Sequence, residues 1–137
     1  EFLSQCFVVG LVSKTVRYKY IVFSHTGDEK TITNTKLETK NWIDTVQELG
    51  AGEIVLNCMN QDGVRNGYDI DQLNIMLANC DVPLIASGGA GNEIHFNDVF
   101  RKTDSSGALA ASVFHKNLIN INDLKKYLKK ELINIRK

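Results

Sequence analysis

The chain has 137 residues, of which 43% are hydrophobic and 23% charged, a composition typical of a globular protein with a real core. Its 16 basic and 16 acidic residues give a formal net charge of zero, which argues against a nucleic-acid binder that depends on bulk charge. No apolar run approaches the roughly 20 residues of a membrane span, so neither nucleic acid nor membrane is an expected partner. The three cysteines are widely spaced, which predicts reduced thiols, a cytoplasmic location without a secretory signal, and no metal site.

The first third of the chain is rich in β-forming residues. Residues 5–12 are short, apolar and β-branched, which predicts a buried strand, and residues 18–25 predict a hairpin or excursion after it. Apolar residues at helical spacing predict a helix over 37–49, with Thr39 as its N-cap and Gly50 ending it.

The remainder alternates regularly between strand and helix patterns. Asp69 is expected near the start of the first of these helices, Asn122 is expected to cap the last, and a short helix is allowed for at Ser112. Strands are predicted at 53–59, 82–87 and 107–114, and helices at 69–80, 92–103 and 120–132.

This order predicts an α/β fold with parallel strands and right-handed crossovers. Four βα units make either a small open sheet or half of a (β/α)8 TIM-type barrel. The barrel half is favoured because glycine and small residues follow the third and fourth βα strands, where such barrels hold a phosphate. We expect residues 1–137 to form a single unit of this kind.

Two neighbouring strand exits carry unusually small residues. The stretch IASGGAG (85–91) places three glycines after a strand, and ALAASVFH (108–115) ends the next strand on Ala110, Ala111 and Ser112. Main-chain amides approach an anion closely only where side chains are small, and a helix start adds partial positive charge. The pair therefore predicts a phosphate cradle without Lys or Arg, although a glycine turn serves tight strand–helix packing equally well.

The polar loop NQDGVRNGYD (60–69) follows the predicted strand at 53–59, which precedes these two strand exits in the chain. Asp62 next to Gly63 is explained by a simple Asx turn, or, at the catalytic face of a barrel, by a general acid or a hydroxyl-binding carboxylate.

Three long motifs carry a family resemblance: GAGEIVLNCMNQDGVRNGYD (50–69), VPLIASGGAG (82–91) and GALAASVFHK (107–116). They closely resemble the C-terminal half of the cyclase subunit of imidazole glycerol phosphate synthase. The resemblance implies strands 5–8 of a (β/α)8 barrel and an enzyme of histidine biosynthesis that uses no cofactor. It implies that ammonia from a glutaminase partner converts a ribulosyl aminoimidazole nucleotide into imidazole glycerol phosphate and an aminoimidazole carboxamide ribotide.

The resemblance also assigns roles to single residues. It implies that Glu53, at the opposite end of its strand from the substrate, belongs to a gate through which ammonia enters. It implies further that one phosphate and the polyol of the substrate bind at Thr26, Asn57, Asp62, Gly63, Gly88, Gly89, Ala111 and Ser112.

Two departures from the family pattern bear on activity. The family uses a catalytic aspartate on its first strand, in the half that this chain does not match, and a second one at the end of its fifth strand. In VVGLVSK (8–14) that second position is Val12, whose side chain exchanges no proton. The alternative is therefore a catalytically inactive half barrel or a phosphate-binding module. We expect no turnover by this chain alone and pairing with the missing N-terminal half or with a second copy, because half a barrel leaves sheet edges and an apolar interior open.

Overall fold

A computed structural model describes residues 6–136. These residues form one six-stranded sheet in the order β3-β2-β1-β4-β5-β6. At one side of the sheet the pairings β1–β2 and β2–β3 are antiparallel. The strands β1, β4, β5 and β6 are parallel to one another. The strand bounds are β1 (Val8–Val16), β2 (Lys19–Ser24), β3 (Thr33–Glu38), β4 (Glu53–Cys58), β5 (Leu84–Ser87) and β6 (Gly107–Leu109).

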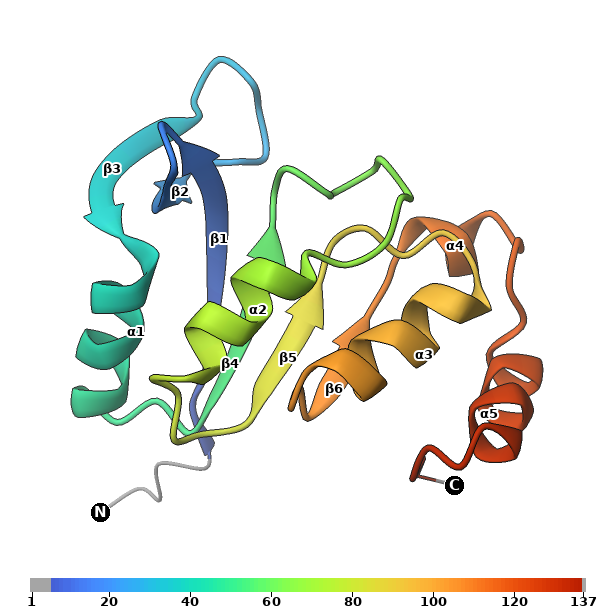
Figure 1. Cartoon of the computed structure of the whole chain (residues 1–137). Coiled ribbons are helices and arrows are strands. Elements are labelled where there is room, and N and C mark those ends of the chain that lie inside the picture. Colours follow the sequence, from blue (N-terminus) through green and yellow to red (C-terminus); the bar gives the residue numbers. More distant parts are fainter. Residues whose placement is uncertain (1–5, 137) are drawn as a thin grey trace.

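Each parallel strand is followed by a helix, which in the case of β1 comes after the antiparallel strands β2 and β3; this confirms the predicted α/β fold with four βα units. Because the strands run the same way, the loops that follow β4 and β5 lie at one end of the sheet together with the exit of β6 (Figure 1). The helices are α1 (Thr39–Glu48), α2 (Ile70–Leu77), α3 (Glu93–Lys102), the single turn α4 (Ser112–His115) and α5 (Ile121–Lys130).

The sheet buries one face under the helices. Along β4 the residues alternate strictly, with Ile54, Leu56 and Cys58 buried and Val55 and Asn57 only half-buried. The same alternation in β1 and β5 places Leu11 and Leu84 in one core with residues of α1, α2 and α3. The core therefore lies between the helices and this single face.

The opposite face of the sheet has no helix over it in the described part of the chain (Figure 1). Val8 is 57% exposed and Leu109 is 46% exposed, while Val12 and Ile85 are half-buried. Parallel sheets normally bury both faces. An uncovered apolar face of this kind fits the predicted half barrel, whose inner face would need a further layer.

A buried polar network joins the C-terminal part of β1 to two helices. The Ser13 and Thr39 hydroxyl oxygens lie 2.7 Å apart, and Gln72 Nε2 donates to Ser13 Oγ at 2.6 Å. All three side chains are almost fully buried, so their polar groups depend on one another for hydrogen bonds. The network fixes the starts of α1 and α2 against β1.

The structure corrects several predicted boundaries in the first half. Leu37 belongs to an additional strand, β3, because residues 33–38 pair with β2, and α1 begins only at Thr39. Thr39 is therefore not the N-cap; its hydroxyl turns inward to Ser13 instead. Gly50 does end α1 as predicted: its φ is +98°, and the amides of Gly50 and Ala51 bond back to the last turn.

The second half needs smaller corrections. Asp69 lies at the start of α2 as expected, and it is the N-cap, accepting from the Gln72 amide at 3.0 Å. The cap of α5 is Asn120 and not Asn122, because the Asn120 side chain accepts from the first free amides of that helix. The strand predicted at 107–114 is shorter, and the short helix allowed for at Ser112 is present as α4. No helix among residues 6–136 combines the length and apolarity that crossing a membrane requires.

Candidate functional site

A pocket of about 260 Å³ lies where β4, β5 and β6 end. Its wall combines the loop after β4, the glycine loop after β5 and the turn from β6 into α4. All the residues predicted to hold substrate line it except Thr26; it is formed by Asn57, Asp62, Gly63, Ser87, Gly88, Gly89, Ala90, Leu109, Ala110, Ala111 and Ser112. Their role in binding stays a prediction, but the two small-residue strand exits do meet at one cavity.

Sheet register explains why these residues converge. Asn57 is paired with Ser87, and Ser87 is paired with Leu109, so the three side chains point to the same face of the sheet. Leu109 and Ala90 were not expected at the site from the sequence. The pairing register, which places Leu109 beside Ser87, is the information that the sequence lacked.

Asn57 and Asp62 form the polar wall of the pocket. Asn57 Nδ2 donates to Asp62 Oδ2 at 3.3 Å, which holds an otherwise exposed carboxylate beside the strand end. Asn57 Oδ1 is buried and has no hydrogen-bond partner in the described part of the chain. A buried acceptor without a partner is unusual in a folded protein, and here it leaves one polar group at the pocket available to a donor from a ligand.

The glycine loop leaves several amides free. The N–H groups of Gly88, Gly89 and Ala90 donate no hydrogen bond to residues 6–136, and neither does that of Ala111. No Lys, Arg or His lines the pocket. Any positive potential in it therefore comes from main-chain dipoles, which suit an oxyanion surrounded by small residues.

The same glycines also pack two loops together. A Cβ on Gly89 would lie 2.0 Å from the Gly67 carbonyl oxygen, and one on Gly91 would lie 2.3 Å from that of Arg65. The Gly67 amide donates to the Gly89 carbonyl at 2.8 Å. Gly91 is thus explained by loop packing alone, while Gly89 serves both the packing and the pocket.

Tyr68 ties the loop after β4 to the third wall. Its hydroxyl donates to the Leu109 carbonyl at 3.1 Å, and its ring meets Phe96 of α3 edge-on at 5.8 Å. Burial raises the pKa of Tyr68 well above its ordinary value of 10.0, so the hydroxyl stays protonated and remains a donor.

The other predicted residues lie away from the pocket. Thr26 is in the turn between β2 and β3 and does not line it. Glu53 is the first residue of β4 and so lies at the opposite end of the strand from Asn57, as expected. Val12 is paired with Asn57 on the uncovered face, which places an isopropyl group in the row of side chains that leads to the pocket.

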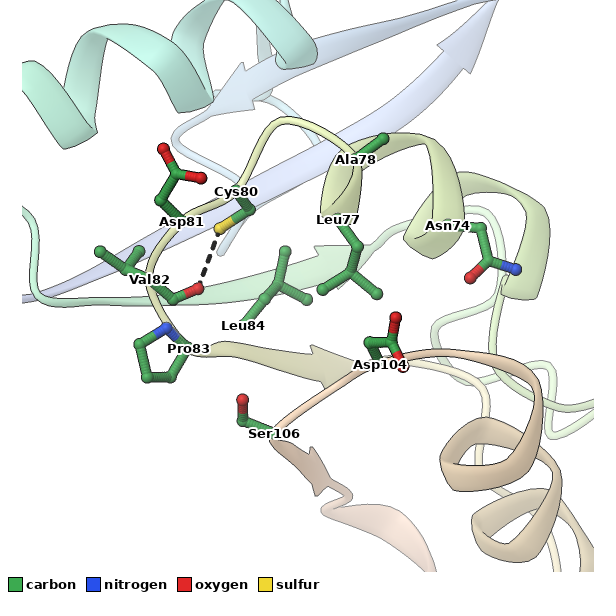
Figure 2. A pocket seen from close by; sticks show the side chains of 10 residues that line it. All are labelled: Asn74, Leu77, Ala78, Cys80, Asp81, Val82, Pro83, Leu84, Asp104 and Ser106. Atoms are coloured by element: carbon green, nitrogen blue, oxygen red, sulfur yellow. Dashed lines mark hydrogen bonds between the residues drawn. The ribbon is translucent and has the colours of Figure 1, made fainter.

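A larger cavity, of about 590 Å³, lies at the other end of β5, between α2 and the loop before β6 (Figure 2). Its charged groups are the carboxylates of Asp81 and Asp104, and the Cys80 thiol donates to the Val82 carbonyl at 3.2 Å. Burial raises the pKa of Cys80, which keeps the thiol neutral. Two carboxylates face this cavity and the free amides of the glycine loop do not, so it suits a phosphate less well than the pocket at the ends of β4–β6.

Comparison with known proteins agrees with this geometry. A family model described as "Histidine biosynthesis protein" matches residues 1–120. The chain belongs to this family. It is 58% identical to the imidazole glycerol phosphate synthase subunit HisF of Aliivibrio salmonicida, over all of this chain and 54% of the relative. It is 57% identical to that subunit of Pseudoalteromonas translucida, over 93% of this chain and 51% of the relative.

The resemblance seen in the sequence motifs is thereby confirmed. The chain spans about half the length of the curated relatives it matches, which agrees with four βα units and an uncovered sheet face. What the family match leaves to be argued is how much of the activity these residues carry.

Proposed function

We propose that this chain supplies the C-terminal, phosphate-binding half of an imidazole glycerol phosphate synthase cyclase. In the complete enzyme, ammonia would react with a ribulosyl aminoimidazole nucleotide to give imidazole glycerol phosphate and an aminoimidazole carboxamide ribotide. The pocket at the ends of β4–β6 would bind one phosphate of that substrate. The observation that carries the proposal is the group of free amides at Gly88, Gly89, Ala90 and Ala111 around a cavity without cations.

Each wall of the pocket has a part in this proposal. The amides of the glycine loop and of the β6–α4 turn would hold the phosphate oxygens, and the Ser112 hydroxyl would add a donor. Asp62, steadied by Asn57, would accept hydrogen bonds from the polyol, and the free Asn57 Oδ1 would take a further donor from it. No metal or other cofactor is required for these steps.

The rest of the activity requires further polypeptide. Residues 1–137 would form one half barrel, and its uncovered face would pair with an N-terminal half barrel or with a second copy. Glu53, at the far end of β4, would belong to the entrance for ammonia from a glutaminase partner. The three cysteines are free thiols, which fits the reducing conditions of a cytoplasm.

Val12 limits what this half can contribute. The resemblance places the family's aspartate at this position, which is the middle of β1 (Val8–Val16), and an isopropyl group neither takes nor gives a proton. We therefore assign binding and orientation of substrate to this chain. Acid–base catalysis would depend on a carboxylate supplied from outside residues 1–137.

The experiment is phosphate binding by the intact polypeptide that contains these residues, followed by amide chemical shifts in NMR. We expect inorganic phosphate to shift Gly88, Gly89 and Ser112, and Ser112→Asp to weaken binding at least tenfold, because it places a like charge beside the anion. Ser106→Asp is the matched control, since Ser106 is exposed at the other end of β5 and β6. Absence of phosphate shifts in the wild type, or equal weakening by both variants, would overturn the proposal.

A further inference from the structure

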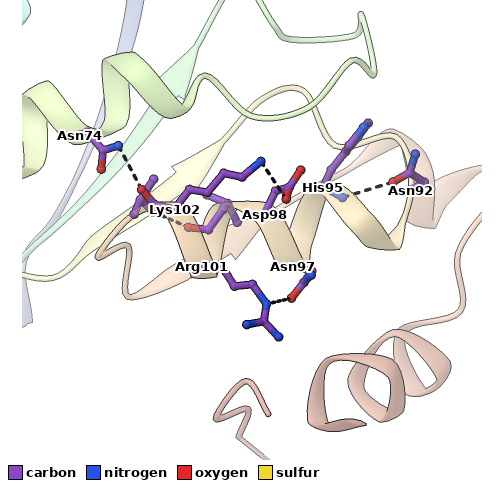
Figure 3. A network of polar contacts seen from close by, with 9 residues as sticks. Asn74, Asn92, His95, Asn97, Asp98, Arg101 and Lys102 are labelled. Atoms are coloured by element: carbon purple, nitrogen blue, oxygen red, sulfur yellow. Dashed lines mark hydrogen bonds and ion pairs between the residues drawn. The ribbon is translucent and has the colours of Figure 1, made fainter. Parts of the chain in front are cut away.

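His95 lies just outside the pocket, in the first turn of α3. Its Nδ1 accepts a hydrogen bond from the Gly91 amide at 2.9 Å, and its ring lies 3.6 Å from the position of a Cβ on Gly67. Figure 3 shows the ring leaving α3 on the side opposite to Arg101. The imidazole is therefore bonded to the glycine loop and lies next to the space beside Gly67 on the loop after β4, although it does not line the pocket itself.

The hydrogen bond fixes the chemical form of this side chain. An imidazole nitrogen that accepts an N–H carries no proton, so the neutral ring must be protonated on Nε2. A doubly protonated ring has no acceptor left, and the Gly91 amide would then lose its partner. The contact thus requires neutral His95 in one particular tautomer.

The position of Gly91 decides where the free amides lie. Gly88, Gly89 and Ala90 form the short connection between the end of β5 and Gly91, so the connection is held at both ends only while Gly91 is held. Loop 60–69, which carries Asp62 and Gly63, is bonded to the same connection through Gly67 and Gly89. Releasing Gly91 would free the far end of the connection and leave the bond between Gly67 and Gly89 as its remaining backbone tie to the neighbouring loop.

We propose that His95 is a positioning residue of the phosphate pocket. Its neutral imidazole, protonated on Nε2, holds the glycine loop in the shape that binds an oxyanion, and its ring supports Gly67 on the neighbouring loop. This inference rests on the proposed function, because it assigns His95 a part in binding at the same pocket.

Three variants separate positioning from helix stability. His95→Phe keeps a ring against Gly67 and removes the acceptor. His95→Asn restores an acceptor, because its Oδ1 is as many bonds from Cα as Nδ1 is. Asn92→Ala is the matched control: the Asn92 side chain caps α3 by accepting from the His95 amide at 3.2 Å, so its loss weakens the same helix start by about 0.5–2 kcal/mol and leaves the imidazole in place (Figure 3).

The test measures the Kd of inorganic phosphate and the unfolding free energy of each intact variant, with the tautomer of His95 read from imidazole nitrogen shifts. We expect an Nε2–H ring, at least fivefold weaker binding in His95→Phe, recovery to within twofold in His95→Asn, and unchanged binding in Asn92→Ala. A wild-type protein that does not bind inorganic phosphate refutes the proposed function. Normal binding by His95→Phe, equal weakening by Asn92→Ala, or an Nδ1–H ring in the wild type refutes the role of His95 specifically.

Discussion

Replacing Gly89 by alanine is the sharpest test of the way the two loops meet. Gly89 has a φ of +111°, and a Cβ there would lie 2.0 Å from the Gly67 carbonyl oxygen and 3.0 Å from Gln61 Cβ. Gly63 also has a positive φ, of +75°, but nothing lies within 4 Å of its added Cβ. The pair therefore separates a backbone-conformation effect from a steric one.

The magnitudes follow from those distances. An alanine with a left-handed backbone is destabilised by about 1–2 kcal/mol, which is the whole effect expected for Gly63→Ala. At Gly89 the Gly67 carbonyl must also retreat by about 1 Å to reach any tolerable contact. That movement breaks the bond from the Gly67 amide to the Gly89 carbonyl, which adds about 1–3 kcal/mol. We expect Gly89→Ala to lower the unfolding free energy by about 2–5 kcal/mol.

The assay is urea unfolding followed by circular dichroism and tryptophan fluorescence, with stability differences taken from the transition midpoints. Gly10→Ala serves as the baseline, because its φ is not positive and its added Cβ meets nothing within 4 Å. If Gly89→Ala is no less stable than Gly63→Ala, the two loops do not meet as described. The glycines after β5 would then have to be explained by the anion site alone.

Two further outcomes follow from buried groups. Thr39→Val removes one hydroxyl from the network with Ser13 and should lower the unfolding free energy by about 1–2 kcal/mol. The control Thr45→Val loses only a bond to its own helix and should change the unfolding free energy by less than about 0.5 kcal/mol. Similar urea midpoints for the two variants would exclude a stabilising network. Burial, with a smaller contribution from Asp69, raises the pKa of the Cys58 thiol above the ordinary 9.0 of the unfolded chain, so unfolding takes up no proton below that pH and releases one above it. The contribution of Cys58 to stability should therefore be level up to about pH 9 and then fall with a slope approaching 1.4 kcal/mol per pH unit, so Cys58→Ala should make the alkaline loss of stability less steep; equal slopes in both proteins would contradict the buried thiol.

Local patterns predicted the second half of the fold well. The strands at 53–59 and 82–87 and the helix after each of them are present, because short apolar runs alternate there with amphipathic stretches in a regular βα order. The end of α1 at Gly50 was also readable, since a Schellman-type ending needs a residue that adopts positive φ without strain.

The errors arose where tertiary contacts override local propensity. Residues 33–38 have few apolar side chains, and they form a strand because the edge of β2 offers them backbone partners. Thr39 has the chemistry of an N-cap, but the buried hydroxyl of Ser13 competes for it from a distance of 26 residues. Neither contact is encoded within a window of neighbouring residues.

The candidate site, like the fold, was predictable from the sequence only in part. The meeting of two small-residue strand exits at one cavity was predictable, because that inference needs only the parallel order of the strands, while binding of an anion there stays a prediction. The role of His95 was not predictable, since its significance comes from the Gly91 amide and from a loop that begins 35 residues earlier in the chain. Leu109 joined the pocket through sheet register alone.

The glycine run also shows why such motifs point to a ligand only in part. Gly91 does not line the pocket and is required by the carbonyl of Arg65, whereas Gly88 and Gly89 line it and are also constrained by protein atoms. The need for glycine therefore does not distinguish packing from binding at any of the three positions. The distinguishing observation is which amides lack a partner: that of Gly91 is bonded to His95, while those of Gly88, Gly89 and Ala90 are free. Packing explains the absence of side chains, whereas three successive donors without a protein acceptor beside a cavity are what binding of an oxyanion by main-chain amides needs.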